Sequence, residues 1–121
     1  MRLPPLPRAI WTPQGRITVV RPRGKLMHEG EECYGLWDPG ERRVSVAPRI
    51  RRDVAWLVLF HELAHQALTD FNVDVPDGPA GKQPPVEQVC DSFAAWQFAR
   101  FQRLVEHHGP DAALIAVGCD G

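Results

Sequence analysis

The sequence has no long apolar run and no strong excess of either charge. Its 14 Lys and Arg residues nearly balance its 15 Asp and Glu residues, which gives a formal net charge of -1. This balance predicts no broad basic surface of the kind that binds nucleic acid or a membrane. No apolar stretch approaches the ~20 residues that span a bilayer. Prolines interrupt residues 1–7, so we expect no signal peptide. These absences favour a cytoplasmic protein with neither nucleic acid nor membrane as a partner.

Cysteine is also scarce. The three cysteines, Cys33, Cys90 and Cys119, show no CxxC spacing, which excludes a zinc knuckle and a disulfide framework. We expect them to be buried thiols. A chain of 121 residues has room for one core. We therefore expect a single domain over residues 1–121, which begins with an extended proline-rich arm over about residues 1–15.

The strongest motif is HELAH at residues 61–65, which matches the pattern HExxH. His61 and His65 are one helical turn apart on the same face of a helix, about 6 Å apart along the axis. Two imidazoles in this arrangement can bind one zinc ion. Glu62 points about 100° round the helix, within reach of the water that the metal activates. The pattern predicts a zinc centre with Glu62 as the general base.

The residues around the motif predict a helix that begins near Asp53 and is buried on most sides. Apolar residues form two adjacent stripes, and the only polar stripe is Glu62, Gln66, Thr69 and Asp70. We therefore expect the helix to be open along the line of Glu62. The alternative is a chance match on a core helix with hydrogen-bonded histidines. It is disfavoured because two histidines on an apolar stripe cost free energy unless each has a partner.

The first half of the chain contains three predicted strands. Residues 17–20 are a β-branched run, whereas residues 25–32 are polar and predict a loop. Residues 33–37 and 43–47 are two strand candidates separated by Asp-Pro-Gly-Glu at 38–41, a sequence typical of a tight turn. The pattern predicts an antiparallel hairpin directly before the motif helix.

The second half predicts a connection and two more helices. Residues 71–83 are rich in Pro, Gly and Asp, and predict either a binding loop or a plain surface connection. A helix is expected from Pro85 to His107 or His108, apolar over much of its circumference and hence part of the core. Residues 111–117 predict a short last helix. We expect an α+β fold in which a small, mainly antiparallel sheet of about three strands packs on two long helices.

A catalytic zinc site needs a third protein ligand. The candidates are Asp74, Asp77, Glu87, Glu106, His107 and His108. Glu87 is best placed, because the first turn of the second helix favours a carboxylate. Asp91 lies on the same face at i+4, where it can accept a hydrogen bond from a ligand histidine. His107 and His108 lie about 30 Å further along that helix, too far to share a metal with Glu87. The alternative is that Glu87 only caps the helix and Asp91 makes a surface ion pair.

Residues 87–94, EQVCDSFA, resemble the E-x-x-A-N-x-F-A segment that follows HELGH in the ImmA/IrrE family of metallopeptidases. The strand-turn-strand before the motif also matches the order of that family, and the resemblance covers about residues 33–101. The chain departs from the family pattern at residues 95–98, AWQF, which replace a leucine-rich continuation, and at three positions within the motifs. Ala64 replaces a glycine, Cys90 replaces an alanine, and Asp91 replaces an asparagine, the last as in thermolysin-type gluzincins.

The resemblance implies a minimal zincin-like fold with zinc bound by His61, His65 and Glu87, and with Glu62 as the base. It implies hydrolysis of a peptide bond in a protein substrate such as a repressor. A transcriptional regulator would then be a separate chain, because no helix-turn-helix domain is fused here. Following the topology of gluzincins, the strand at residues 33–37 is the sheet edge beside which the substrate would lie. Phage and mobile elements carry such proteins.

Two alternatives to an active peptidase remain open. One is a zinc-stabilised protein-binding or regulatory module with little or no peptidase activity. Glu62 argues against this module, because a structural site does not need that carboxylate, whereas the small size of the chain argues for it. The other alternative is an α+β domain without metal. The sequence identifies no oxyanion donor: Tyr34, the only tyrosine, is either that donor or a packing residue of the strand.

Overall fold

The computed structural model describes residues 2–119, which form an α+β fold. The main sheet has the strand order β1-β2-β6-β5, namely β1 (Ala9–Thr12), β2 (Gly15–Val20), β6 (Arg43–Val46) and β5 (Gly35–Asp38). The outer pairs are antiparallel, and the central pair, β2 with β6, is parallel. A separate hairpin consists of β3 (Met27–His28) and β4 (Glu31–Glu32). The helices in this range are α1 (Arg52–Asp70), α2 (Pro85–His108) and α3 (Pro110–Ala116).

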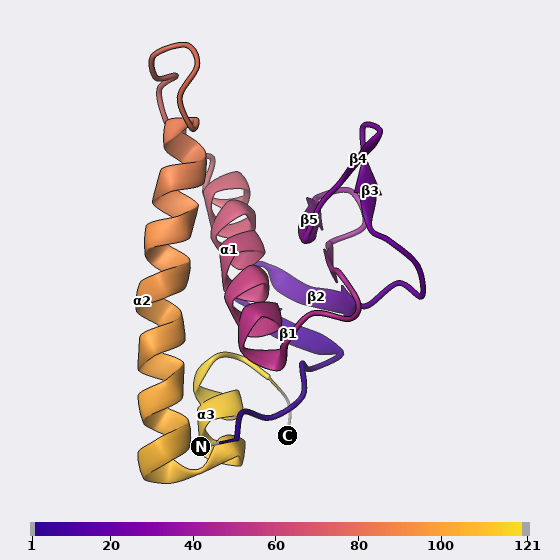
Figure 1. The fold of residues 1–121 in the computed structure, drawn as a ribbon. Coiled ribbons are helices and arrows are strands. Elements are labelled where there is room, and N and C mark those ends of the chain that lie inside the picture. Colours follow the sequence, from indigo (N-terminus) through magenta and orange to yellow (C-terminus); the bar gives the residue numbers. More distant parts are fainter. Residues whose placement is uncertain (1, 120–121) are drawn as a thin grey trace.

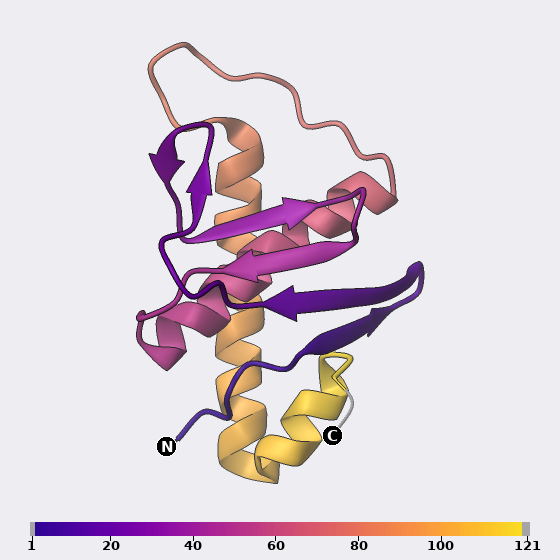
Figure 2. The ribbon, with the colours of Figure 1, turned by 90° about the vertical axis from the view of Figure 1, so that its right-hand side faces the viewer.

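Helix α1 lies between the sheet and α2, so the fold has three layers (Figure 1). Turned by 90°, the sheet lies in front and α1 crosses behind it (Figure 2). One apolar core joins the layers. At its centre the ring of Trp56 is 4.3 Å from that of Phe101 and 5.6 Å from that of Phe60. Val44 and Val46 of β6 are fully buried in the same core, because residues two apart in a strand point to the same face of the sheet.

The predicted hairpin before the motif helix is confirmed. Gly35 pairs with Val46, and Asp38 pairs with Arg43 in the antiparallel ladder of β5 and β6. The Oδ1 atom of Asp38 accepts a hydrogen bond from the backbone N–H of Glu41 at 3.2 Å, the contact that makes aspartate suited to such a turn. β5 lies at one edge of the sheet, with β6 as its only strand neighbour among the described residues.

The main sheet differs from the prediction of about three mainly antiparallel strands, because it is mixed and has four. The segment predicted to be an extended arm contains β1, whose residue Ile10 is only 2% exposed. A strand as short as β1, preceded by prolines, shows little hydrophobic periodicity in the sequence. Its pairing also depends on β2, most of which lies outside the predicted arm. Residues 25–32, predicted to be a loop, contain the β3–β4 hairpin.

The residues before β1 are tied to α1. Trp56 Nε1 donates to the carbonyl oxygen of Pro4 at 2.7 Å, and Arg52 donates to that of Leu3 at 2.9 Å. The other end of the described chain covers the outer edge of β1, where the backbone N–H of Trp11 donates to the carbonyl oxygen of Gly118 at 2.8 Å. These contacts close the sheet at the side opposite β5.

Most of the polar stripe of α1 lies against the sheet, whereas the sequence predicted that the stripe would be open to solvent; of its four residues, Thr69 is exposed. Glu62 is 8% exposed and Gln66 is 5% exposed. Arg42, from the turn between β5 and β6, donates to both carboxylate oxygens of Asp70, at 2.9 and 3.0 Å, and Gln66 also donates to Asp70. The hairpin therefore supplies hydrogen-bond partners to the polar groups of α1, which lowers the free-energy cost of burying them.

Helix α2 is buried on one face only, and the prediction of a largely apolar core helix is wrong for its outer face. Its buried residues are Cys90, Ala94, Phe101 and Val105. Val89, Phe93 and Trp96 remain 45%, 42% and 60% exposed. Because α2 forms the outermost layer, only the face turned to α1 and α3 finds packing partners.

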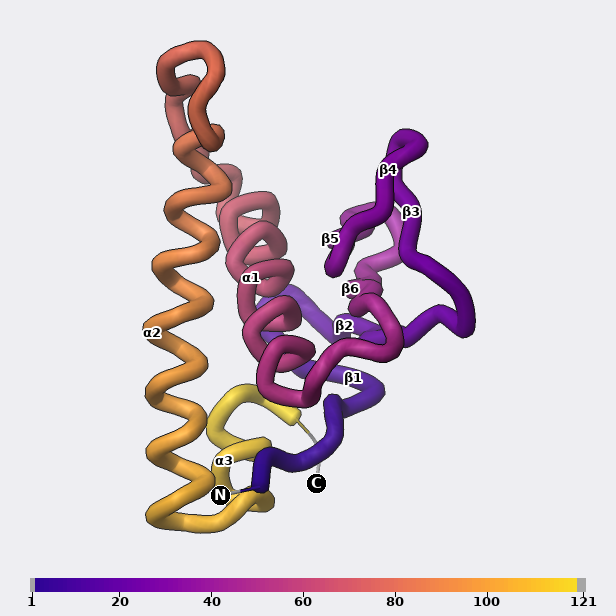
Figure 3. The backbone as a smooth tube through the Cα atoms, in the orientation of Figure 1, coloured from indigo at the N-terminus to yellow at the C-terminus, as the bar shows by residue number. Residues whose placement is uncertain are grey.

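Residues 71–84 connect α1 to α2 without regular secondary structure. In the backbone trace this connection lies at the end of the molecule opposite α3 (Figure 3). None of the helices in residues 2–119 combines the length and the apolar character needed to cross a membrane.

Candidate metal centre

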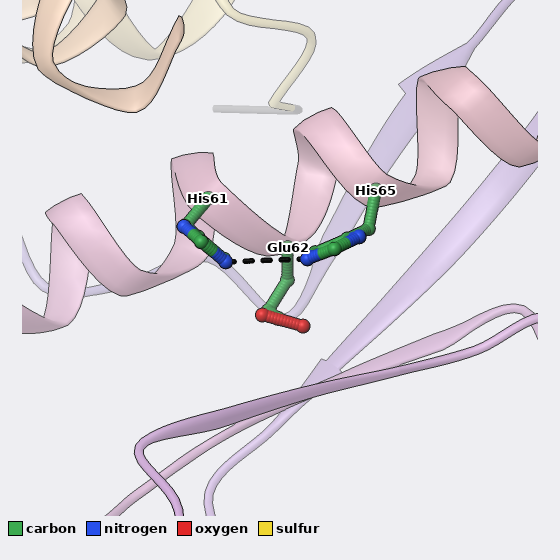
Figure 4. Close-up of side chains that lie close together, drawn as sticks. All are labelled: His61, Glu62 and His65. Atoms are coloured by element: carbon green, nitrogen blue, oxygen red, sulfur yellow. Dashed lines mark hydrogen bonds between the residues drawn. The ribbon is translucent and has the colours of Figure 1, made fainter. Parts of the chain in front are cut away.

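The two histidines of the motif face each other on α1 (Figure 4). Their Nε2 atoms are 3.2 Å apart, and their ring centroids are 4.9 Å apart. Ligand atoms of His61, Glu62 and His65 all lie within 4.8 Å of one another. This group could hold a metal ion.

Helix α2 brings a second carboxylate to the histidines. Glu87 lies in the first turn of α2, where its Oε2 atom is 3.0 Å from His61 Nε2 and its Oε1 atom is 2.9 Å from His65 Nε2. The distances place Glu87 on the open side of both imidazoles. The carboxylate is 37% exposed, so the centre is partly open to solvent.

The hydrogen-bonding capacity of these groups is the reason to expect a cation between them. His61 Nδ1 faces a carboxylate and donates to it, so in neutral His61 the Nε2 atom is an acceptor. That atom lies 3.0 Å from another acceptor, a carboxylate oxygen of Glu87. Such a contact is repulsive unless a positive charge lies between the two atoms. A tetrahedral ion with bonds of about 2.0–2.1 Å would separate its ligand atoms by about 3.3 Å, close to the observed spacing.

The carboxylate facing His61 Nδ1 is Asp91. Its Oδ1 atom is 2.7 Å from that nitrogen, and Asp91 lies one helical turn beyond Glu87 on the same face of α2. A hydrogen bond to Nδ1 fixes the tautomer in which Nε2 carries the lone pair needed by a metal. The structure thus brings together Glu87 and Asp91, as the sequence predicted, with one at each nitrogen of His61.

Glu62 occupies the buried side of the centre. Burial raises the pKa of its carboxyl to about 7, and the negative charge of Glu87 acts in the same direction. The electrostatic interaction with His61 and a hydrogen bond from the backbone N–H of Trp37 lower the pKa and only partly offset the effect of burial. A carboxyl with a pKa near neutrality can both accept and release a proton at physiological pH.

The edge strand approaches α1 very closely at Gly35. A Cβ atom on Gly35 would lie 2.6 Å from Cγ1 of Val58 and 2.9 Å from Cγ of Glu62. Only glycine fits this contact without displacing a neighbour. The close approach brings the backbone of β5 to Glu62 and allows Trp37 to donate to its carboxylate.

A cleft of about 550 Å³ opens from the centre between the two helices and β5. Its apolar lining residues are Leu36, Leu57, Val58, Ala94 and Ala95. His28 of β3 also lines it, together with Cys33 and Tyr34. Tyr34 is 65% exposed and does not pack into the core.

The cysteines separate into two groups. Cys90 and Cys119 are buried as predicted, whereas Cys33 is partly exposed. Burial raises the pKa of the Cys90 thiol to about 11, and the nearby carboxylates of Glu87, Glu62 and Asp91 add to this effect. Cys90 therefore stays protonated at neutral pH, as expected of a packing residue and not of a metal ligand.

The other proposed third ligands are not brought to the centre. Asp74 and Asp77 are exposed in the connection, and Glu106, His107 and His108 are exposed at the far end of α2. Sequence reasoning missed Gly35 and Gln83, which the structure places at or beside the site. A glycine inside a predicted strand is a signal of close backbone approach and could have identified Gly35.

A comparison with protein-family models gives no match for this chain, and a comparison with curated proteins gives none either.

Proposed function

We propose that this chain is a zinc-dependent metalloendopeptidase of the gluzincin type, with zinc bound by His61, His65 and Glu87. The observation that carries the proposal is the convergence of one carboxylate and two imidazole nitrogens, from two helices, within 3.2 Å of one another. Two histidines and a glutamate, with a fourth position left to water, are a ligand set of catalytic zinc sites. The resemblance of about residues 33–101 to the ImmA/IrrE metallopeptidases supports the same assignment.

The proposed reaction is hydrolysis of a peptide bond. Held by His61, His65 and Glu87, a zinc ion would act as a Lewis acid toward the carbonyl group and would acidify a water molecule, which adds to the carbonyl carbon as the C–N bond breaks. Glu62 takes the proton of that water and passes it to the leaving amine. Its carboxylate lies within 4.8 Å of the imidazole nitrogens of His61 and His65, which is within reach of a water molecule held there. Asp91 orients the ring of His61 and increases its basicity toward the metal.

The substrate is proposed to be an extended segment of a protein. Ala47 donates its backbone N–H to the carbonyl oxygen of Tyr34, so the backbone groups of Gly35 and Trp37 point away from β6. The N–H of Trp37 already donates to Glu62. An extended peptide can add to the sheet edge through the other outward groups, namely the N–H and carbonyl of Gly35 and the carbonyl of Trp37. The apolar residues of the cleft would receive its side chains. The resemblance to the ImmA/IrrE family implies that the substrate is a regulatory protein, such as a repressor, and that it is a separate chain.

Metal analysis of Glu87 variants tests the proposal. Wild-type protein should bind one zinc ion per chain. Loss of a residue that only hydrogen-bonds a metal ligand weakens metal binding about 10- to 100-fold, and Glu87→Ala should weaken zinc binding by more than this. Glu106→Ala is the matched control, because Glu106 lies on the same helix, exposed at its far end. Equal zinc affinity in Glu87→Ala and wild type would exclude Glu87 as a ligand.

Peptidase activity is tested with a mixture of peptides from a cell lysate, read by mass spectrometry. Zinc-loaded wild type should produce new peptide ends, and Glu62→Gln should retain zinc but cleave about 10²- to 10⁴-fold more slowly. Zinc binding without any cleavage would favour the alternative function, a zinc-stabilised module that binds a partner. Equal cleavage by both forms would remove Glu62 from the mechanism.

A further inference from the structure

We propose that Gln83 is a positioning residue, which orients Asp91 and through it the metal ligand His61. Gln83 lies at the end of the connection between α1 and α2, a segment that the proposed reaction does not use. Its Nε2 atom donates to Asp91 Oδ2 at 2.8 Å, while Asp91 Oδ1 is 2.7 Å from His61 Nδ1. The inference rests on the proposed metal centre and extends it to a residue outside both helices.

The two oxygens of Asp91 have different partners, and this determines what Gln83 contributes. A carboxylate bonded through one oxygen can still turn about its terminal torsion, which has broad energy wells. Asp91 is 56% exposed, so water competes for both oxygens. A second, directed hydrogen bond on Oδ2 fixes the carboxylate plane and keeps Oδ1 aimed at His61. Gln83 thus acts on the metal only through Asp91.

Gln83 is itself held in place. Its backbone carbonyl oxygen accepts a hydrogen bond from Nε2 of Gln88 at 2.9 Å. Two prolines follow it, Pro84 and Pro85, and their rings restrict the backbone at and after Gln83. The amide of Gln83 is therefore presented to Asp91 from a backbone with few alternatives. The connection is in this way linked to the imidazole of His61 through two side-chain contacts, Gln83 to Asp91 and Asp91 to His61.

The test replaces Gln83 by methionine, which has a similar length but no donor. Gln83→Met should weaken zinc binding roughly 3- to 10-fold, less than the about 10- to 100-fold expected for losing a direct outer partner such as Asp91. In nitrogen NMR spectra of zinc-loaded protein, the Nδ1 resonance of His61 should shift while those of His65 stay in place. Gln102→Met is the matched control, about three turns further along α2 than Asp91.

A double variant separates this role from a general effect on the fold. In an Asp91→Ala background, Gln83→Met should change the zinc affinity no further, because its only route to the metal has been removed. Unchanged zinc affinity in Gln83→Met would overturn the proposal, as would an equal loss in both backgrounds. Wild type that binds zinc but cleaves nothing would overturn only the peptidase assignment. Wild type that binds no zinc would overturn both.

Discussion

At the scale of single residues, Glu62 is the side chain whose surroundings differ most from those of an ordinary glutamate. It is 8% exposed, carries a pKa raised to about 7, and accepts a hydrogen bond from the backbone of the edge strand. The HExxH pattern alone predicted its place beside the histidines, because i to i+1 geometry on a helix is local. Its burial could not be predicted, because it depends on β5 lying over the polar stripe of α1.

The raised pKa of Glu62 predicts a pH-dependent stability in the metal-free protein. The pKa of Glu62 in the folded protein, about 7, exceeds the ordinary value of 4.5. The stabilising contribution of the protonated carboxyl is therefore fully present below pH 4.5 and is lost as pH rises through about 7. With each pKa unit worth about 1.4 kcal/mol, the loss is about 3 kcal/mol. Glu62→Gln cannot ionise, so relative to wild type it should become more stable between pH 5 and pH 8. Urea unfolding of chelator-treated protein at both pH values measures this, and a pH-independent difference would contradict it.

Gly35 is the other residue whose identity the site requires. Gly35→Ala should destabilise the protein by about 1–3 kcal/mol, since the new Cβ lies too close to Val58 and Glu62. It should also slow cleavage by displacing Glu62. Adding Val58→Ala removes the nearer of the two contacts, 2.6 Å away, and should restore part of the stability. Urea denaturation compares the single and double variants. If Val58→Ala restores nothing, the steric explanation is wrong.

At the scale of elements, the helices and the hairpin could be predicted because their signals are local. Periodicity indicates α1 and α2, and the Asp-Pro-Gly turn indicates the hairpin of β5 and β6. The parallel pairing of β2 with β6 joins segments with about 20 residues between them, and no local pattern encodes it. Gln83 was missed for a similar reason, because its contact with Asp91 depends on where the connection ends.

The hydrogen bonds between Arg42 and Asp70 hold the β5–β6 turn to the end of α1. Arg42→Ala should destabilise the protein by about 1–3 kcal/mol, because it leaves a mostly buried carboxylate without its main partner. The hydrogen bond from Arg42 lowers the pKa of Asp70. The stability that this bond contributes is therefore present above the ordinary carboxyl pKa and is lost as pH falls through the lowered pKa of Asp70. The penalty of Arg42→Ala should accordingly shrink in acid.

A matched variant calibrates that measurement. Arg51 pairs with Asp53 at 3.2 Å, but its side chain is 79% exposed. Arg51→Ala should therefore cost no more than about 1 kcal/mol. Chemical denaturation of the two variants at pH 7 compares the pairs directly. Equal losses would show that the partly buried bond to Asp70 has no special weight.

At the scale of the whole molecule, the candidate metal centre joins the two layers formed by α1 and α2. Removing zinc should lower the melting temperature, because only the folded chain presents the histidines and Glu87 together. With free zinc at 100 times its Kd, binding adds about 2.7 kcal/mol, which corresponds to a shift of roughly 10 °C. Thermal unfolding with and without chelator measures it. Glu87→Ala should show little of this shift, and loss of bound zinc without any shift in wild type would contradict the prediction.

The two outer edges of the main sheet bear on how copies of this chain can self-associate. Unpaired strand edges are the surfaces through which folded proteins join into aggregates. The contact between Trp11 and Gly118 covers the β1 side, so within residues 2–119 the exposed edge is that of β5. β5 is four residues long and lies in a cleft beside α1, where the approach of another folded sheet is obstructed. The main sheet therefore leaves one short strand edge unpaired, in a cleft that admits an extended chain more readily than a second folded sheet.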